Sequence, residues 1–353
     1  MTSSSWKKRT LFPVFWIGAV LYRVAVRVRL TLYRFHLLPT RRLPLKVISI
    51  GNLVAGGTGK TPHTALLALF LQGKGVKTAV LSRGYRGTET RKGAVISDGK
   101  SILGTVEEGG EEPFLLAQKL PGVPVVVGKD RYRSGMFCAR QWQTEWVVLD
   151  DGFQHLSLKR DVDILLLPAH RPLGSERLLP LGLLREPIKE MKRADIILIT
   201  HSERLDPSGK NKLAREIQSR TPTTPFFFSE HKPVSLWRYQ DKEVLPLSCL
   251  EGKSLLAFCG LAEPESLAFS LKQLGARVAR LVPFPDHHFY QEEDKRSLEN
   301  GSRSSQVHLL ITTEKDALKL GPWEAEGLQV LVLGIEVEVE DPAFWDLLDQ
   351  RIG

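Results

Sequence analysis

The sequence predicts an α/β protein: a core built on a parallel sheet, a smaller C-terminal α/β domain and an N-terminal amphipathic helix. From residue 45 onward, short apolar runs alternate with segments of helical periodicity. These runs are apolar on both faces, as strands are when helices cover both sides of a parallel sheet. With 353 residues, 42% of them hydrophobic, the chain is long enough to form two domains of ordinary size.

The expected elements follow one another in a regular order along the first domain. Strands are expected at 46–52, 76–82, 123–128, 146–152, 162–167 and 194–200. Helices are expected between the first four strands, at 61–72, 112–119 and 131–142. This alternation of strands and helices indicates a parallel sheet covered by helices.

A change of texture near residue 221 marks the expected domain boundary. The segment "TPTTPFFFSEHKPVSLWRY" is rich in proline and aromatic residues, and a new αβ pattern starts at residue 253. We therefore expect a core domain at 45–220 and a smaller domain at 221–353. The smaller domain is expected to contain strands at 279–284, 307–313 and 328–334 and a last helix at 342–351.

Residues 1–44 form a basic segment that is expected to associate with a membrane. Residues 1–50 contain ten Lys or Arg and no Asp or Glu, whereas the other 303 residues carry 39 basic and 40 acidic residues. The apolar run from Leu11 to Tyr22 is twelve residues long, and crossing a bilayer takes about 20. The pattern predicts a helix at the surface of an anionic membrane, with packing on the protein's own core as the alternative.

The remaining composition excludes other classes of function. Because the body of the chain is near neutral, we expect no nucleic acid as a partner. The three cysteines, Cys138, Cys249 and Cys259, lack the spacing of metal ligands and do not form an even-numbered disulfide framework. They indicate a reducing compartment.

The segment "GNLVAGGTGKTP", residues 51–62, has the features of a loop that binds phosphate. An expected strand leads into a glycine-rich turn, and an apolar-periodic helix follows. Such a turn supplies backbone N–H groups, a lysine for the β- and γ-phosphates and a hydroxyl for Mg²⁺. Val54 stands where the usual pattern has glycine, which is tolerable if its φ is negative. The expected nucleotide-binding residues are Val54, Ala55, Gly56, Gly57, Thr58, Gly59, Lys60 and Thr61.

Two adjacent carboxylates follow another expected strand, in "EWVVLDDGFQH". Asp150 and Asp151 would repel each other at the end of a strand unless a cation lay nearby. Mg²⁺ between them and the phosphates accounts for the pair, and a solvated acidic turn is the alternative. The pattern therefore predicts a P-loop NTPase-like core with a metal site formed by Thr61, Asp150 and Asp151.

The order of its motifs resembles that of the tetraacyldisaccharide 4'-kinases, which phosphorylate a precursor of lipid A. The motifs cover nearly the whole chain after the N-terminal helix: "GNLVAGGTGKTP", "SRGYRG", "GEEP", "KDR", "LDDGFQHLSLKRD", "LLREP", "FPDHHFY" and "TTEKDALK". The resemblance implies transfer of the γ-phosphoryl group of ATP, with Mg²⁺, to the 4'-hydroxyl of the anionic glycolipid tetraacyldisaccharide 1-phosphate. The product would be the 1,4'-bisphosphate, lipid IVA, formed at the cytoplasmic face of the inner membrane.

The resemblance also implies roles for individual residues. Lys60 would bind the β- and γ-phosphates, Thr61 would bind Mg²⁺, and Asp150 and Asp151 would complete the metal environment.

The proton of the 4'-hydroxyl would pass to an acidic residue paired with a histidine, here Glu111 and His287. The family has Asp in a G-D-E-P motif where this chain has Glu111, whose side chain is one methylene longer. Either carboxylate can act as a base that a histidine orients. If the backbone does not accommodate the longer side chain, Glu112 or Asp286 would take part instead.

Three arginines within the motifs, Arg83, Arg131 and Arg185, are expected to offer positive charge to phosphate, either the transferred group or the 1-phosphate of the lipid. For Arg185, a local ion pair with Glu186 is the alternative. Asp316 in "TTEKD" is expected either to contact the nucleotide base or to cap the next helix.

Two other functions are compatible with the phosphate loop. One is that of another P-loop enzyme, either a soluble small-molecule kinase or a metal-insertion GTPase. The other is that of a non-enzymatic, nucleotide-dependent membrane-binding module. The first predicts activity on water-soluble acceptors, and the second predicts ATP binding and membrane association without phosphorylation of an acceptor.

Overall fold

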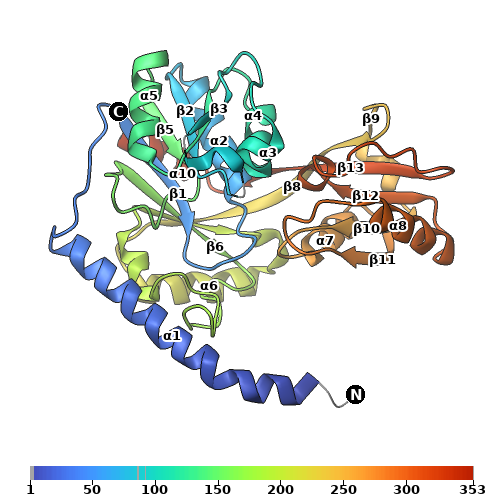
Figure 1. Ribbon diagram of the computed structural model, residues 1–353, viewed down its shortest axis with the longest axis horizontal. Helices are drawn as coiled ribbons and strands as arrows, with labels where there is room; N and C mark the ends of the chain where they lie inside the picture. Colours follow the sequence, from blue (N-terminus) through green and yellow to red (C-terminus); the bar gives the residue numbers. More distant parts are fainter. Residues whose placement is uncertain (1–3, 86, 92, 353) are drawn as a thin grey trace. The chain divides into compact units, whose positions relative to one another are not determined.

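The computed structural model describes residues 4–85, 87–91 and 93–352, with side chains from Trp16 onward except those of residues 90 and 91. The chain divides into two compact units (Figure 1). The first is built from the segments up to residue 83, 128–230 and 339 to the C-terminus, and the second from 84–127 and 231–338.

This division differs from the expected one, which placed 45–220 in one domain and 221–353 in the other. Residues 84–127 belong to the second unit, and the last residues, from 339 onward, belong to the first. Two long strands are the reason. β8 (Phe226–Arg238) carries the chain out of the first unit, and β13 (Gln329–Val339) carries it back. Chain order therefore does not separate the two units.

Parallel strands form the centre of the first unit. They are β1 (Lys46–Asn52), β2 (Thr78–Ser82), β5 (Trp146–Leu149), β6 (Val162–Pro168), β7 (Ile196–Thr200) and the start of β8, in the order β8-β7-β6-β1-β5-β2. Each neighbouring pair runs parallel. Apart from the first residue of β1, the strands β1, β2, β5, β6 and β7 are buried throughout, as their two-sided apolar sequences predict. The expected α/β fold is confirmed.

The helices of the first unit are α1 (Ser4–Arg34), α2 (Lys60–Gly73), α5 (Arg131–Trp142), α6 (Pro207–Arg220) and α10 (Ala343–Ile352), with short 3₁₀ turns η2 (Ile188–Arg193) and η3 (Ser202–Arg204). Leu213 and Ile217 of α6 join one apolar cluster with Leu165 of β6 and Ile197 of β7. α6 therefore covers the side of the sheet to which these strand residues point.

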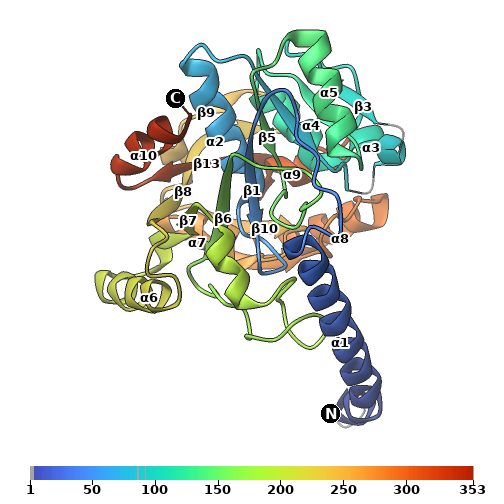
Figure 2. The same ribbon diagram turned by 90° about the vertical axis from the view of Figure 1, so that its left-hand side faces the viewer.

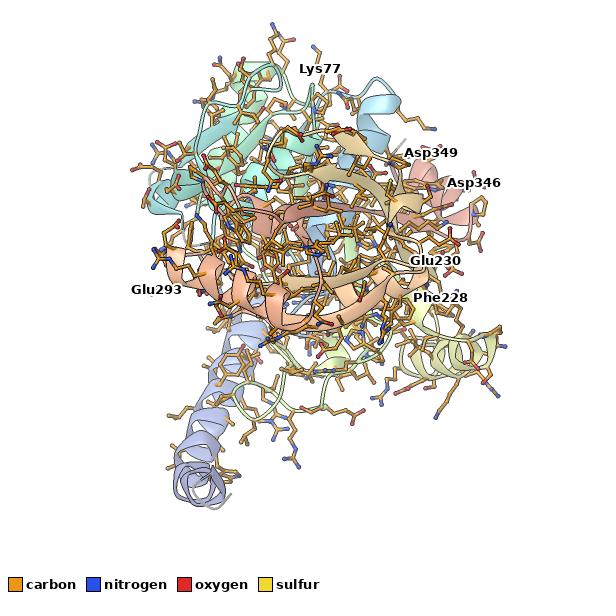
Figure 3. The ribbon with its side chains drawn as sticks, turned by 90° about the vertical axis from the view of Figure 1, so that its right-hand side faces the viewer. Lys77, Phe228, Glu230, Glu293, Asp346 and Asp349 are labelled. Carbon is orange, nitrogen blue, oxygen red and sulfur yellow. The ribbon has the colours of Figure 1, made fainter. Side chains whose placement is uncertain are left out.

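α10 returns to the first unit and lies against α2. The rings of Phe70 on α2 and Trp345 on α10 are 4.5 Å apart. Figure 3 labels Asp346 and Asp349 on α10, and Asp349 pairs with Lys74 at 2.6 Å. The last residues of the chain thus help to hold the helix that follows the expected phosphate loop.

The second unit is also built on parallel strands. They are β10 (Ser254–Cys259), β11 (Arg277–Pro283), β12 (Leu309–Thr313) and β13, in the order β11-β10-β12-β13. Alternate residues of β10 point to opposite faces. Leu255 and Ala257 pack with α7 (Glu265–Gln273), whereas Leu256 and Phe258 pack with α8 (Glu292–Ser304).

Shorter elements complete the second unit. The segment 84–127 contains η1 (Thr88–Arg91), β3 (Ala94–Ser97), α3 (Val106–Gly109), α4 (Glu111–Lys119) and β4 (Val125–Val127), and β3 pairs antiparallel with β4. β9 (Val244–Leu245), η4 (Leu247–Leu250) and α9 (Glu314–Ala317) lie in its second segment.

The second half of α1, the dark blue helix in Figure 2, contacts the rest of the first unit through one of its sides. Val26 is buried, the hydroxyl of Tyr22 donates to the carbonyl of Arg185 at 2.9 Å, and Arg29 lies 3.8 Å from Glu186. Another side exposes the apolar residues Trp16, Ile17, Val20, Leu21, Val24 and Val28. The side chains of residues 11–15, the first part of the apolar run, lie outside those described. Among the described residues, none of the helices has the length and apolar character needed to span a membrane. Packing on the protein itself thus involves one side of α1.

Candidate active site

The expected phosphate loop connects β1 to α2. β1 ends at Asn52 and α2 begins at Lys60. Gly59 precedes the helix with a left-handed backbone, φ 75°, which costs a residue with a Cβ about 1 kcal/mol. The side-chain amide of Asn52 donates to the carbonyl of Val54 and to the hydroxyl of Thr58, both at 2.8 Å. These bonds hold the loop in one shape ahead of the start of α2, and backbone N–H groups at a helix N-terminus suit an anion.

Val54 is accommodated because it lies in an extended segment. It forms an antiparallel bridge with Leu184, and the N–H of Ala55 donates to the carbonyl of Leu183 at 2.7 Å. The side chain of Val54 is 3% exposed, in an apolar cluster that also contains Leu53, and its φ is not positive. Valine therefore fills core volume at a position where the backbone does not require glycine.

Asp151 lies between two positive side chains. Nη1 of Arg185 contacts both carboxylate oxygens at 2.9 Å, and Nζ of Lys60 lies 3.9 Å from Oδ1. Burial opposes ionisation of Asp151, but Lys60 and Arg185 outweigh it and hold its pKa below the ordinary value. The alternative pairing of Arg185 with Glu186 is wrong, because Glu186 pairs with Arg193 at 2.5 Å.

Asp150 is buried and bound by hydroxyl groups. Its carboxylate accepts from Ser82 at 3.0 Å and from Thr64 at 3.2 Å. Since it is 2% exposed, a solvated acidic turn is the wrong description of this residue. Arg131 is buried too and donates to the carbonyl of Gly128 at 2.8 Å. Burial lowers the pKa of Arg131 to about 10, so its guanidinium stays positive at neutral pH.

The oxygen donors at this edge of the sheet fit Mg²⁺. Thr61 is the second residue of α2, directly after Lys60, and its side chain, which carries a hydroxyl, is half-buried. Asp150 and Asp151 add carboxylates, and the lowered pKa of Asp151 keeps its carboxylate ionised. Mg²⁺ takes hard oxygen ligands and usually retains several waters. These three residues could therefore hold the ion together with phosphate oxygens.

His63 supports the loop from within the core. Its Nδ1 lies 2.6 Å from the carbonyl of Gly59, and its Nε2 lies 2.7 Å from the hydroxyl of Ser229. Because a carbonyl oxygen accepts and never donates, Nδ1 carries the proton and Nε2 accepts from the hydroxyl. Burial lowers the pKa of His63 to about 4, so the ring is neutral at physiological pH.

Glu111 and His287 lie in contact within the second unit. Oε1 of Glu111 is hydrogen-bonded to Nδ1 of His287. Glu111 is the first residue of α4 and follows Gly110, whose φ is 88°. A Cβ on Gly110 would lie 2.5 Å from the carbonyl oxygen of Tyr85, so the glycine is required by both its backbone and its surroundings. The extra methylene of Glu111 does not keep it from the histidine.

Further charged side chains surround this pair. Nζ of Lys315 lies 3.3 Å from an oxygen of each of Glu111, Glu112 and Asp286. Asp286 flanks the second ring nitrogen of His287 at 3.6 Å. Glu111, Asp286 and His287 are close enough together to bind a metal ion. However, the ammonium of Lys315 offsets their negative charge, so the group suits proton transfer better than metal binding.

Asp316 is fully buried at the N-terminus of α9. Its N–H donates to the hydroxyl of Thr313, and that hydroxyl lies 2.7 Å from Oδ2 of Asp316. Oδ1 accepts from the N–H of Gly260 at 2.9 Å and from the hydroxyl of Tyr290 at 3.0 Å. Protein groups therefore bind both oxygens of Asp316, and the residue that caps α9 is Thr313 and not Asp316.

Comparison with known proteins decides among the functions compatible with this geometry. The family model described as tetraacyldisaccharide-1-P 4'-kinase, LpxK, matches residues 11–353. The chain belongs to this family. A tetraacyldisaccharide 4'-kinase from Syntrophus aciditrophicus (strain SB) is 39% identical over 333 residues, which cover 92% of this chain and 88% of the relative. Another, from Desulfatibacillum aliphaticivorans, is 38% identical over 343 residues, covering 95% and 91%.

A solved structure of the same family shares the fold. The crystal structure of LpxK from Aquifex aeolicus in complex with ATP has a TM-score of 0.74 and 33% identity, over 98% of this chain and 99% of that one. The resemblance based on the ordered motifs is confirmed. It makes the chain an ATP-dependent glycolipid kinase rather than a soluble small-molecule kinase, a GTPase or a non-enzymatic module.

Three further side chains contact the expected site residues and were not predicted from the sequence. Thr64 and Ser82 bind Asp150, and Lys319 lies 2.7 Å from Oε2 of Glu111. Ser82 and Lys319 lie within two of the family motifs, "SRGYRG" and "TTEKDALK", and these motifs could have pointed to both residues. Thr64 lies one helical turn after Lys60, a spacing that places both on one side of α2.

Proposed function

We propose that this chain transfers the γ-phosphoryl group of ATP to the 4'-hydroxyl of tetraacyldisaccharide 1-phosphate, with residues 54–61 as the phosphate site and Glu111 as the base. The observation that carries the proposal is Lys60 at the start of α2, paired with Asp151, which also binds Arg185. A lysine at a helix N-terminus after a glycine-rich loop, with a carboxylate opposite, suits a nucleoside triphosphate and its metal ion. The ATP in the similar Aquifex aeolicus structure supports the choice of nucleotide.

The loop and the start of α2 bind the phosphate chain. Backbone N–H groups donate to its oxygens, and Lys60 neutralises the β- and γ-phosphates. Arg185, held in place by Asp151, offers a planar fork of donors to the transferred group. Thr61, Asp150 and Asp151 would hold Mg²⁺, and the ion would supply further neutralisation of the phosphate charge.

Glu111 accepts the proton of the 4'-hydroxyl as the oxygen of that hydroxyl attacks the γ-phosphorus. The bond from the γ-phosphorus to the bridging oxygen breaks, and ADP leaves with the electron pair of that bond. His287 orients the base through its hydrogen bond to Oε1. The ammonium of Lys315, 3.3 Å from the same oxygen, favours the ionised form of Glu111 that proton transfer requires.

A membrane-embedded acceptor accounts for the exposed side of α1. The apolar residues on that side form a continuous stripe, and Arg27, which is also exposed, follows Val20 by two helical turns. An apolar stripe beside arginines suits the headgroup region of an anionic membrane. α1 would thereby hold the kinase at the cytoplasmic face of the inner membrane, where the lipid is reached.

The proposal is tested by incubating the full chain with γ-labelled ATP, Mg²⁺ and detergent-dispersed tetraacyldisaccharide 1-phosphate, followed by chromatography of the lipid. We expect label in the 1,4'-bisphosphate. Label on a water-soluble sugar, with none on the lipid, would contradict the acceptor. Glu111→Gln should lower turnover by about two to four orders of magnitude with an unchanged KM for ATP. Normal turnover in that variant would contradict the assignment of the base.

A further inference from the structure

Lys319 is a buried lysine whose charge is directed at the base. Its side chain is fully buried, and its ammonium lies 2.7 Å from Oε2 of Glu111 and 3.4 Å from Oδ1 of Asp316. A lysine is rarely buried unless it is paired, because removing an ammonium group from water costs several kcal/mol. Burial indeed lowers the pKa of Lys319, so its positive charge depends on the carboxylates beside it.

Asp316 is held rigidly enough to fix Lys319. Its two oxygens are bound by the N–H of Gly260, which follows β10, by the hydroxyl of Tyr290 and by the hydroxyl of Thr313 at the end of β12. These partners come from three separate segments of the second unit. The position of Asp316, and with it that of the Lys319 ammonium, is therefore determined by the local turn from Thr313 to Lys319 together with contacts to the distant residues Gly260 and Tyr290.

The two oxygens of Glu111 have different partners. Oε1 faces Nδ1 of His287 and the ammonium of Lys315, whereas Oε2 faces Lys319. Glu111 is 6% exposed, so its carboxylate is buried. Without Lys319, none of the cations in these contacts would face its second oxygen, Oε2. The carboxylate could then rotate, or it could bind a proton, and either change would remove the base from the histidine.

We propose that Lys319 is a positioning residue for the phosphoryl transfer: its ammonium, fixed by Asp316, holds Oε2 of Glu111 so that Oε1 stays ionised and directed at His287. This also explains how the chain tolerates the longer glutamate, since a fixed cation at the far oxygen removes the freedom that an extra methylene adds. The inference rests on the proposed role of Glu111 as base. The proposal predicts that Lys319 affects turnover and the pH dependence of turnover, in addition to any effect on the stability of the fold.

The first test compares Lys319→Met with the wild type in the lipid phosphorylation assay. Methionine keeps the approximate length of the side chain and removes its charge. We expect kcat to fall by about ten- to a hundredfold, a fraction of what a general base contributes, with the KM for ATP unchanged. The acidic limb of the pH profile of kcat should move to higher pH, because the carboxylate binds a proton more readily without the ammonium. The other titratable or charged groups close to Glu111, Lys315 and Lys319 stay in place: His287, Lys315, Asp286, Glu112 and Asp316.

Lys295→Met is the matched control. Lys295 is also buried in the second unit, but its ammonium pairs with Glu292 at 2.6 Å and with the carbonyl of Pro322 at 2.7 Å. Loss of this lysine should leave the pH profile in place, whatever it does to the melting temperature. An equal shift of the acidic limb in Lys295→Met and Lys319→Met would show a general effect of losing a buried lysine and would overturn the proposal.

A double-mutant cycle separates positioning from a structural role. If Lys319 acts through Glu111, adding Lys319→Met to Glu111→Gln should lower kcat no further. A further loss of tenfold or more in the double variant contradicts the proposal. Normal activity of Glu111→Gln alone would instead refute the base assignment, so the two failures are distinguishable. Should Lys319→Met fail to fold, by circular dichroism, Lys319→Gln keeps a polar donor without the charge and carries the same expected shift of the acidic limb.

Discussion

Lys60 and Arg185 both contact the carboxylate of Asp151, but Arg185 lies much closer to it than Lys60 does. Lys60 lies 3.9 Å away, at the outer limit of ion-pair distance. Arg185 contacts both oxygens at 2.9 Å and is oriented by them. We therefore expect Lys60 to turn toward an incoming phosphate at small cost, while Arg185 keeps its position.

Lys60→Ala should lower turnover by about two to three orders of magnitude, since it removes a charge that acts on the developing negative charge of the transferred phosphate. The fold should persist, because the lysine contributes no core packing. The measurement is lipid phosphorylation combined with thermal unfolding. Lys74→Ala is the control: Lys74 lies at the other end of α2, exposed, and should leave turnover unchanged. Full activity of Lys60→Ala would refute the phosphate site.

His63 links the stability of the first unit to pH. Its pKa is about 4 in the folded protein and near 6.5 when the ring is exposed, because burial disfavours the charged ring. Between about pH 6.5 and pH 4, His63 therefore binds a proton in the unfolded chain but not in the folded chain. The stability that His63 contributes is fully present above about pH 6.5 and is lost as the pH falls toward 4.

The corresponding measurement is urea unfolding of the wild type and of His63→Gln at pH 7.5 and pH 5. We expect the stability difference between the two proteins to shrink by roughly 2 kcal/mol at the lower pH, out of a total of about 3 kcal/mol for the full window. His36→Gln, at an exposed position, serves as the control. A difference that stays constant between the two pH values would argue against a buried neutral His63.

Among the elements, α1 has two distinct sides. Val26 and Tyr22 attach one side to the protein, and the other presents large apolar residues to solvent. A helix that served the protein's own core alone would not expose side chains such as Leu21, which is 65% exposed. The second side is therefore the expected contact with the lipid surface.

The double substitution Leu21→Asp/Val24→Asp should weaken sedimentation with anionic phospholipid vesicles by about tenfold or more, because each change removes an apolar group and adds repulsion from the anionic surface. Activity on detergent-dispersed lipid should fall less. Val244→Asp introduces a charge at another exposed apolar residue, 77% exposed, and should not affect vesicle binding. Unchanged binding of the double variant would exclude this side of α1 as the membrane contact.

At the scale of the whole molecule, the chain leaves the first unit and returns to it. α10 is the last helix, yet its residue Phe344 is fully buried with its ring 5.5 Å from that of Phe227 on β8, and its neighbour Trp345 packs on Phe70 of α2. The last helix thus supports the unit that contains the proposed phosphate loop.

Phe344→Ala should lower the free energy of unfolding by about 3 to 5 kcal/mol, the usual cost of emptying a buried aromatic site. Urea unfolding measures this cost, and ATP binding by the folded fraction should remain. Phe137→Ala on α5 is the matched control in the same unit, at a position 42% exposed, and should change stability by well under 1 kcal/mol. Equal losses in the two variants would contradict the role of α10.

Secondary structure was predictable from the sequence where it depends only on the residues of one segment. β1 and α5 have the bounds expected from their apolar patterns, and the turn between β1 and α2 has the expected glycines. The pairing of Glu111 with His287, 176 residues apart, came from the family motifs and not from any periodicity. The partner of Arg185 and the places of Thr64, Ser82 and Lys319 were not predicted, because long-range packing determines them.

The sequence by itself determined the α/β class and the family and predicted the phosphate loop, because these depend on periodicity and on residue types at fixed spacing, which are local properties. The tertiary structure alone decided which segments form each unit, which side of α1 remains exposed and which charges surround Asp151 and Glu111. Burial and ion pairing act between residues far apart in the chain, and their energy depends on distance and exposure. These distances and exposures are set only when the strands assemble and the side chains become buried.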